Sequence, residues 1–147
     1  MPEKEVFFIT FKTHRFYDGM HEVLSDEEKQ IVLENIKNGS GKYYVLIAVV
    51  VLNNHVHIMM FHEGKYEFSG IMRGIKSKTA RLINISRKVN GVSVWQTESF
   101  DRVVRNEAEL NEKLKYMYEN PTKQGYEGDP IDYKYFFLNE KYEKMIK

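Results

Sequence analysis

Two histidines one residue apart lie in the apolar stretch Leu52–Met60, which reads L-N-N-H-V-H-I-M-M. If this stretch is a strand, His55 and His57 point to one face of a sheet, because successive strand side chains alternate between faces. Two buried imidazoles need polar partners, and one divalent cation can bind a nitrogen from each. The pair is therefore a candidate metal site, although core or hydrogen-bonded histidines give the same pattern more often.

The composition limits the classes of chemistry. The chain has 147 residues, 42% apolar and 14% aromatic, which is typical of one globular domain. We expect residues 1–147 to form that domain, with 126–147 as a C-terminal aromatic tail. The absence of cysteine excludes thiolate zinc sites and thiol nucleophiles. A charged N-terminus, and an apolar run at Tyr43–Leu52 too short to cross a bilayer, predict a cytoplasmic protein without a membrane partner.

The cations are unevenly distributed, although the net charge is only +1. The segment Ser69–Val89 contains six cations and no acid. Together with two later arginines, these cations form a predicted track for DNA phosphates: Arg73, Lys76, Lys78, Arg81, Arg87, Lys88, Arg102 and Arg105. An ordinary solvated helix face would explain them equally well.

The elements that must position these residues begin with a strand and a helix. Val6–Phe11 has the aromatic and β-branched composition of a strand. In the helix that follows, Ser25 is the predicted N-cap, Glu28 completes a capping box, and Gly39 comes after the last turn. Tyr43–Val51 then predicts a strand of apolar residues.

The histidine strand is predicted to be the second arm of a hairpin. Asn53 and Asn54 can adopt the positive φ that a tight turn requires, and they would send His55–Phe61 back antiparallel to the preceding strand. This places the histidines near the centre of a sheet.

A long helix is predicted at Ser69–Val89. Its apolar residues share one side at about 100° per residue, and they are Ile71, Ile75, Leu82, Ile85 and Val89. Lys78 falls within this apolar arc, so it either extends from the helix edge or points into a site. Val92–Val104 then predicts a strand with an irregular middle.

The last predicted helix, Glu107–Glu119, has a buried stripe of Leu110, Leu114 and Met117. We expect it to stop at Asn120-Pro121, because the residue before proline avoids helical geometry. Tyr116 and Asn120 are four residues apart and share a face beside the stripe, whereas Tyr118 projects from the other flank. The aromatic residues of the tail would cover an exposed edge of the sheet, and they are Tyr133, Tyr135, Phe136 and Phe137.

This order of elements predicts an α+β ferredoxin-like sandwich, an antiparallel sheet with helices packed on it. Four motifs then resemble one family: N-N-H-V-H at Asn53–His57, I-M-R-G-I-K at Ile71–Lys76, V-W-Q-T-E-S-F-D-R at Val94–Arg102, and Y-M-Y-E-N-P-T-K-Q-G at Tyr116–Gly125. The chain resembles the single-tyrosine HUH transposases of insertion sequences, of the IS200-like superfamily, and is most similar to their REP-associated tyrosine transposase branch.

The resemblance implies the HUH endonuclease fold and a metal-dependent endonuclease and strand transferase, whose partner is single-stranded DNA with hairpin ends. It implies that His55 and His57 bind Mg²⁺ or Mn²⁺, and that Tyr116 is the nucleophile that forms a 5′-phosphotyrosine. Imidazole ligands also suit zinc, nickel or cobalt, so the metal stays open. Asn120 takes the place of the carboxamide that completes the metal site; the family commonly has glutamine there, and Asn120 could instead cap the helix. The resemblance also implies a bacterial protein that acts at the nucleoid.

Other functions remain open at this stage. A replication initiator or relaxase of the HUH class shares the motif but usually carries further domains. A non-catalytic single-stranded nucleic-acid-binding module is the alternative of another class, and it leaves the histidine pair unexplained. A domesticated nuclease that cuts host repeats is the third alternative. Whether the chain acts as a homodimer also stays open.

Overall fold

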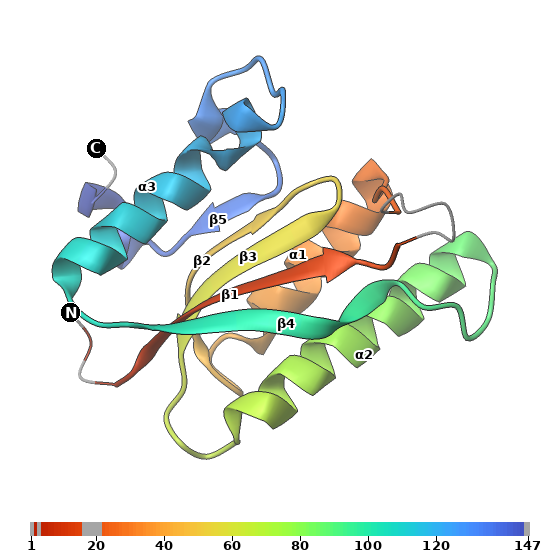
Figure 1. Cartoon of the computed structure of the whole chain (residues 1–147), viewed down its shortest axis with the longest axis horizontal. Helices are drawn as coiled ribbons and strands as arrows, with labels where there is room; N and C mark the ends of the chain where they lie inside the picture. The colour runs from red at the N-terminus through yellow and green to blue at the C-terminus, as the bar shows by residue number, and fades with distance from the viewer. Residues whose placement is uncertain (1, 3, 16–21, 146–147) are drawn as a thin grey trace.

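The computed structural model describes residue 2 and residues 4–15 and 22–145 (Figure 1). Its strands form one five-stranded antiparallel sheet in the order β4-β1-β3-β2-β5. The strands are β1 (Val6–Thr13), β2 (Val45–Val51), β3 (His55–Phe61), β4 (Trp95–Val104) and β5 (Phe136–Leu138). The helices are α1 (Asp26–Gly39), α2 (Phe68–Arg87) and α3 (Glu107–Lys123), with short 3-10 helices η1 (Pro130–Asp132) and η2 (Glu140–Met145). The predicted α+β ferredoxin-like sandwich is confirmed.

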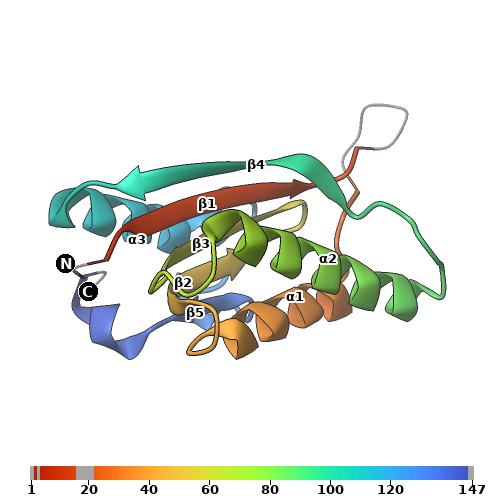
Figure 2. The same ribbon diagram turned by 90° about the horizontal axis from the view of Figure 1, so that it is seen from below.

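Helices cover both faces of the sheet, with α1 and α2 on one side and α3 on the other (Figure 2). The predicted alternation of β3 is confirmed: Val56, Ile58 and Met60 are buried under α1 and α2. Met59 is buried under α3, so the histidine face is the α3 face. Leu110, Leu114 and Met117 are each 0% exposed, as the stripe on α3 predicts.

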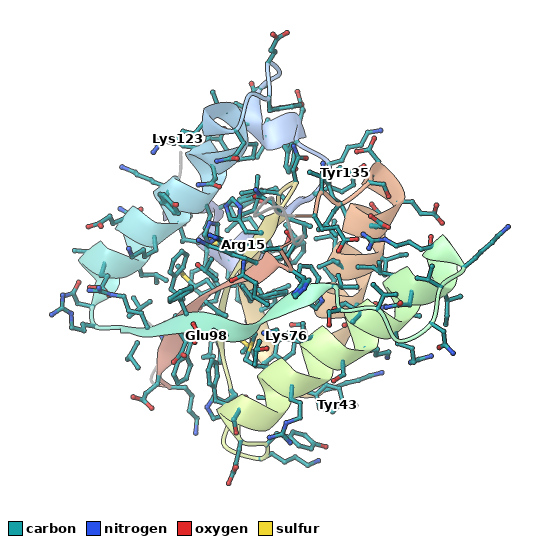
Figure 3. The ribbon with its side chains drawn as sticks, turned by 45° about the vertical axis from the view of Figure 1, so that its right-hand side comes forward. Arg15, Tyr43, Lys76, Glu98, Lys123 and Tyr135 are labelled. Atoms are coloured by element: carbon teal, nitrogen blue, oxygen red, sulfur yellow. The ribbon has the colours of Figure 1, made fainter. Side chains whose placement is uncertain are left out.

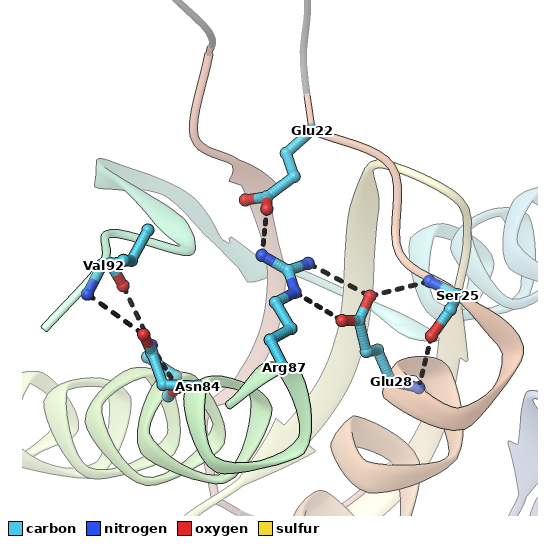
Figure 4. A network of polar contacts seen from close by, with 7 residues as sticks. Glu22, Ser25, Glu28, Asn84, Arg87 and Val92 are labelled. Atoms are coloured by element: carbon cyan, nitrogen blue, oxygen red, sulfur yellow. Dashed lines mark hydrogen bonds and ion pairs between the residues drawn. The ribbon is translucent and has the colours of Figure 1, made fainter. Parts of the chain in front are cut away.

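The start of α1 and the end of α2 are joined by a buried ion-pair network (Figure 4). The predicted capping box is present, since Ser25 and Glu28 exchange hydrogen bonds. The Arg87 guanidinium binds both oxygens of Glu28 and also the carboxylate of Glu22. Burial alone raises the pKa of Glu28, but hydrogen bonds from Arg87 and Ser25 outweigh it and hold that pKa below its usual value.

The predicted hairpin between β2 and β3 is confirmed, but its turn does not use the expected positive φ. In the described part of the chain, Lys88 is the one non-glycine residue with positive φ. Asn53 and Asn54 therefore form the turn with negative φ. The Leu52 N–H donates to the carbonyl of His55 at 2.9 Å, and this bond encloses the two loop residues Asn53 and Asn54. The carbonyls of both asparagines accept backbone hydrogen bonds from other segments, which hold the loop in place.

The buried side of α2 is only partly the predicted one. Ile71 and Ile75 are buried and Leu82 is half-buried, but Ile85 and Val89 are 62% and 44% exposed. The helix therefore turns a different side toward the sheet in its C-terminal half.

Two polar residues explain this difference. Thr79 is 0% exposed, and its hydroxyl accepts a hydrogen bond from the Trp95 indole at 2.9 Å. Asn84 is also buried, and its amide binds both the N–H and the carbonyl of Val92 (Figure 4). Because both groups are satisfied by hydrogen bonds, they can be buried, and an apolar pattern alone misses them.

The prediction that the last helix ends before Pro121 is wrong, because α3 continues to Lys123 with Pro121 inside it. Proline removes only one helical hydrogen bond, the one to the carbonyl of Met117. The last turn is held by the N–H groups of Gln124 and Tyr126, which donate to the carbonyls of Asn120 and Pro121. Asn120 therefore lies inside the helix and not at its end.

The C-terminal residues close the β2 edge of the sheet, as the aromatic tail predicts. Phe136 and Leu138 pair with Val50 and Ala48. The predicted irregular middle of Val92–Val104 is confirmed, because the register of β4 with β1 shifts between Trp95 and Ser99.

Candidate active site

The two histidines lie on the central strand β3, which pairs with β1 on one side and β2 on the other. His57 stands between Thr10 and Val50, and Lys12 is the β1 partner of His55. Because the register aligns these residues in rows, the side chains of Thr10 and Lys12 share the histidine face.

His57 is arranged as a neutral imidazole with one nitrogen available. The residue is 4% exposed, and its Nδ1 lies 2.7 Å from the Thr10 hydroxyl. Its Nε2 is buried without a hydrogen-bond partner among the described residues. Burial, with the nearby charges of His55, Lys12 and Lys113, lowers the pKa of His57 to about 3. A neutral imidazole with an unused ring nitrogen is the form that binds a metal ion.

His55 is oriented by its neighbour in the turn. Its Nδ1 lies 2.8 Å from the side-chain oxygen of Asn54, so Nδ1 carries the proton and the lone pair lies on Nε2. The ring centroids of His55 and His57 are 4.9 Å apart. The turn therefore determines the tautomer as well as the position of the first histidine.

Tyr116 on α3 faces the buried histidine. Its ring centroid is 5.4 Å from that of His57, and Phe8 packs against both rings. Tyr116 is 39% exposed, so its hydroxyl group can be reached by a large substrate. Tyr118 lies on the other flank of the helix, where its ring contacts Phe136 at 6.0 Å.

Asn120 lies one helical turn after Tyr116 and is 2% exposed. Its Oδ1 is buried and accepts no hydrogen bond from the described residues. The alternative that Asn120 caps the helix is wrong, because α3 continues to Lys123 and Gln124 is the C-cap residue. A buried carboxamide oxygen without a donor needs another partner, and a cation is one.

An open cavity of about 780 Å³ brings His55, His57 and Tyr116 together, and Asn120 is not among the residues that line it. The predicted residues that line it are His55, His57 and Tyr116. Residues that were not predicted as site residues also line it, namely Phe8, Thr10, Lys12, Asn54, Phe100, Lys113 and Gln124. Lys123 lies at the same helix end, with its Nζ 5.4 Å from the Tyr116 ring centroid (Figure 3). Spacing along α3 could have identified Lys113, Lys123 and Gln124, which lie three, seven and eight residues from Tyr116.

The predicted DNA-binding cations of α2 do not lie on the histidine face, because α2 packs on the opposite face of the sheet. Arg87 is engaged by Glu22 and Glu28. Lys76 donates hydrogen bonds to the carbonyls of Gln96 and Thr97, which joins α2 to β4 (Figure 3). The exposed members of the predicted set on this side are Arg73, Lys78, Arg81 and Lys88.

The two later arginines of the predicted track lie near the start of α3. Arg102 binds both oxygens of Glu109, at 3.0 and 3.1 Å, and Arg105 binds the same carboxylate at 3.2 Å. The hydrogen bond from Arg102, helped by Arg105, lowers the pKa of Glu109 to about 2. Both arginines are exposed, so each retains a solvent-facing surface.

The described residues also bear on the expected metal and membrane partners. No group of three or more histidine, cysteine, aspartate or glutamate side chains could hold a metal ion there. Two imidazoles and a carboxamide are a different kind of set. No described helix is both long and apolar enough to cross a bilayer.

Comparisons with known proteins agree on one family. A family model described as Transposase IS200 like matches residues 17–119. A protein assigned as a REP-associated tyrosine transposase in Haemophilus influenzae is 25% identical over 121 residues, which cover 71% of this chain. The REP-associated tyrosine transposase of Escherichia coli K12 is 28% identical over 92 residues, or 62% of this chain. The chain spans 69% and 52% of the lengths of these relatives.

Solved structures show the same fold. A REP-associated tyrosine transposase bound to a REP hairpin superposes with a TM-score of 0.70 at 22% identity, covering 92% of this chain and 77% of that chain. A Deinococcus radiodurans R1 protein assigned as a transposase gives a TM-score of 0.52 at 18% identity, covering 80% and 93%. Since the family model matches well over half of the sequence, the chain belongs to the IS200-like transposases, a family of DNA-processing enzymes.

Proposed function

We propose that this protein cleaves and rejoins single-stranded DNA that carries a hairpin, through a 5′-phosphotyrosine on Tyr116. One observation carries the proposal: two buried polar atoms that have no hydrogen-bond partner among the described residues, Nε2 of His57 and Oδ1 of Asn120, belong to the two elements that also bring the Tyr116 ring against His57. Buried polar atoms without partners are costly, and a cation bound between the sheet and the helix would give both atoms a partner.

The residues present fit a divalent cation. His55, His57 and Asn120 would hold Mg²⁺ or Mn²⁺ through two imidazole nitrogens and one carboxamide oxygen. When bound, such a cation makes a phosphate more electrophilic and stabilises a leaving oxygen. Thr10 and Asn54 support this assignment, because their hydrogen bonds orient the two rings and direct Nε2 of each away from the backbone.

The chain's own groups account for the covalent step. The Tyr116 oxygen bonds to phosphorus as the bond from phosphorus to the 3′-oxygen breaks. The proton lost by the phenol is balanced by the one gained by the 3′-oxygen, so the products are a 5′-phosphotyrosine and a free 3′-hydroxyl. The reverse attack by another 3′-hydroxyl restores the phosphodiester and frees the tyrosine, so rejoining needs no ATP. The Lys123 ammonium beside the Tyr116 ring and Lys113 three residues before it place positive charge where the phosphate binds.

DNA would reach the site over a surface with positive charge on both sides of the sheet. We propose that Lys12, Lys113 and Lys123 bind the strand at the cavity, and that the exposed cations of the predicted track bind the rest of the substrate: Arg73, Lys78, Arg81, Lys88, Arg102 and Arg105. The solved relative bound to a REP hairpin supports a hairpin partner. We assign Arg87 and Lys76 to structural roles instead.

We further propose that residues 1–147 act as one cytoplasmic domain at the bacterial nucleoid. A homodimer with a shared active site is testable by mixing Tyr116→Phe and His57→Ala proteins, each inactive alone. Recovered cleavage in the mixture would show that Tyr116 of one chain works with the histidines of another. No recovery is expected if each active site is built from one chain.

The decisive experiment tests the nucleophile. Wild-type protein, Mg²⁺ or Mn²⁺ and single-stranded DNA with an imperfect hairpin should give a denaturant-resistant adduct on the 5′ side of the cut. Tyr116→Phe should lose this adduct and keep both its melting temperature and its DNA affinity. Tyr118→Phe is the matched control, because Tyr118 is on the same helix and contacts Phe136 instead, and it should keep the adduct.

The same adduct assay tests the metal. Excess EDTA, or His57→Ala, should abolish the adduct without loss of DNA binding. An adduct that survives Tyr116→Phe, or one that forms undiminished in EDTA, would contradict the proposal. A protein that binds the hairpin but gives no adduct under any of these conditions would favour the non-catalytic binding module.

A further inference from the structure

An exposed aromatic ring, that of Phe100, lines the cavity of the proposed active site, and the proposed chemistry does not use it. Phe100 is 58% exposed and lines the cavity that also contains His55, His57 and Tyr116. It lies on β4, the edge strand farthest from β2 and β5 (Figure 1). The ring is therefore open to a substrate.

The sheet register aligns Phe100 with the site. Phe100 pairs with Thr10, and Thr10 pairs with His57, so these three residues form one row on the histidine face. Two strand intervals separate Phe100 from His57, which is about 10 Å. That separation is on the scale of a single nucleotide, so a strand whose phosphate is held at His57 can place a neighbouring base over the Phe100 ring.

The surroundings of Phe100 differ from those of the other cavity aromatic. Phe8 is half-buried, and its ring packs against His57 and Tyr116. Within the described residues, the Phe100 ring contacts no other aromatic ring. The Lys12 Nζ lies 5.9 Å from its centroid. A ring face with an adjacent ammonium group provides a stacking surface for a base and a contact for its phosphate.

We propose that Phe100 and Lys12 form a nucleobase subsite, which stacks an unpaired base beside the phosphate that is cut. This inference rests on the proposed DNA-cleaving function and names the part of the strand that the cavity holds. Stacking tolerates any base, because every base has a π-face, so this subsite sets the position of the strand and not its sequence.

The subsite can be tested by binding alone. In Tyr116→Phe protein without added metal, the unpaired bases of a hairpin oligonucleotide are replaced one at a time by 2-aminopurine, whose fluorescence is quenched by stacking. One position should be quenched on binding, and it should adjoin the cut mapped with wild-type protein. Phe100→Ala and Phe100→Leu should remove this quenching and weaken binding roughly 5- to 100-fold. Phe100→Trp should restore both.

Two controls separate stacking from other roles. Val103→Ala changes a 39% exposed residue on the other face of β4 and should leave affinity and quenching unchanged. Lys12→Ala should lower the slope of log affinity against log salt by about 0.7, whereas Phe100→Ala should not change that slope.

The outcomes distinguish the subsite from the nuclease proposal. Quenching at no position, or equal effects of Phe100→Ala and Val103→Ala, would overturn the subsite whatever the cleavage assay gives. Quenching that depends on Phe100 in a protein that forms no tyrosine adduct would support the subsite and overturn the nuclease proposal.

Discussion

Thr10→Val tests whether the hydrogen bond behind His57 prepares that ring to bind a metal. Valine keeps the shape and β-branching of threonine but removes the hydroxyl that lies 2.7 Å from Nδ1 of His57. Loss of a group that orients a metal-binding histidine typically weakens metal affinity by about 10- to 100-fold, or about 1.4–2.8 kcal/mol. His57 is 4% exposed, so water cannot easily replace the lost hydroxyl.

The same substitution should also lower the stability of the metal-free protein. A buried ring nitrogen without a partner costs about 1–3 kcal/mol, which corresponds to roughly 2–10 °C in melting temperature for a domain of this size. The structural and metal-binding effects therefore need separate measurements.

Thermal melts across a Mn²⁺ titration separate the two effects. Saturating Mn²⁺ stabilises the folded state according to its affinity, so the extra stability that it gives should be about 1.4–2.8 kcal/mol smaller in Thr10→Val than in wild type. Thr10→Ser retains a hydroxyl and is the matched control. Equal Mn²⁺ stabilisation of all three proteins, with a lower metal-free melting temperature in Thr10→Val, would show that Thr10 only supports the fold and would refute the metal-orienting role.

Three further predictions concern the helix, the ion pairs and the cations. Asn120→Ala should abolish Mn²⁺ stabilisation and the tyrosine adduct, whereas Gln124→Ala should keep both; the reverse result would make Gln124 the third ligand. Arg87→Ala should destabilise the fold by about 3 kcal/mol, because it leaves the buried Glu28 carboxylate unpaired. Since the folded-state pKa of Glu28 lies below its ordinary 4.5, wild-type stability should fall as pH drops below that value, and urea melts should show a smaller fall in Arg87→Ala. Lys113→Ala should weaken binding of a hairpin oligonucleotide and reduce its salt dependence, whereas equal binding at every salt concentration would exclude a phosphate contact.

Local patterns predicted the elements of the site well where one physical rule dominates. Strand alternation places His55 and His57 on one face whatever the rest of the chain does, and the apolar stripe of α3 determines which side of that helix is buried. Tyr116 follows from the stripe, because it lies beside Met117. These features depend on residues close together in sequence.

The features of the site that were not predicted depend on contacts between segments that are distant in the sequence. Phe100 and Lys12 join the site only through the register of β1 with its two neighbours, which no local pattern determines. The face on which each cation lies could not be predicted either, because it depends on α2 and α3 packing on opposite sides of the sheet. Pro121 misled the prediction because its local preference is outweighed by the hydrogen bonds that close the last turn.

The location of the histidines on a strand bonded from both sides has a consequence for hydrogen exchange. The backbone of His57 lies between Thr10 and Val50 in the middle of the ladder, so its amide should exchange only when most of the sheet opens. The last residues of α3 follow a proline, and Gly125, just beyond the C-cap residue, has φ of +99°, so we expect this helix end to open alone at a smaller free-energy cost. We therefore expect the imidazole pair to keep its spacing through local openings of the molecule. If an ion binds there as proposed, opening of the helix end would limit how quickly it enters or leaves.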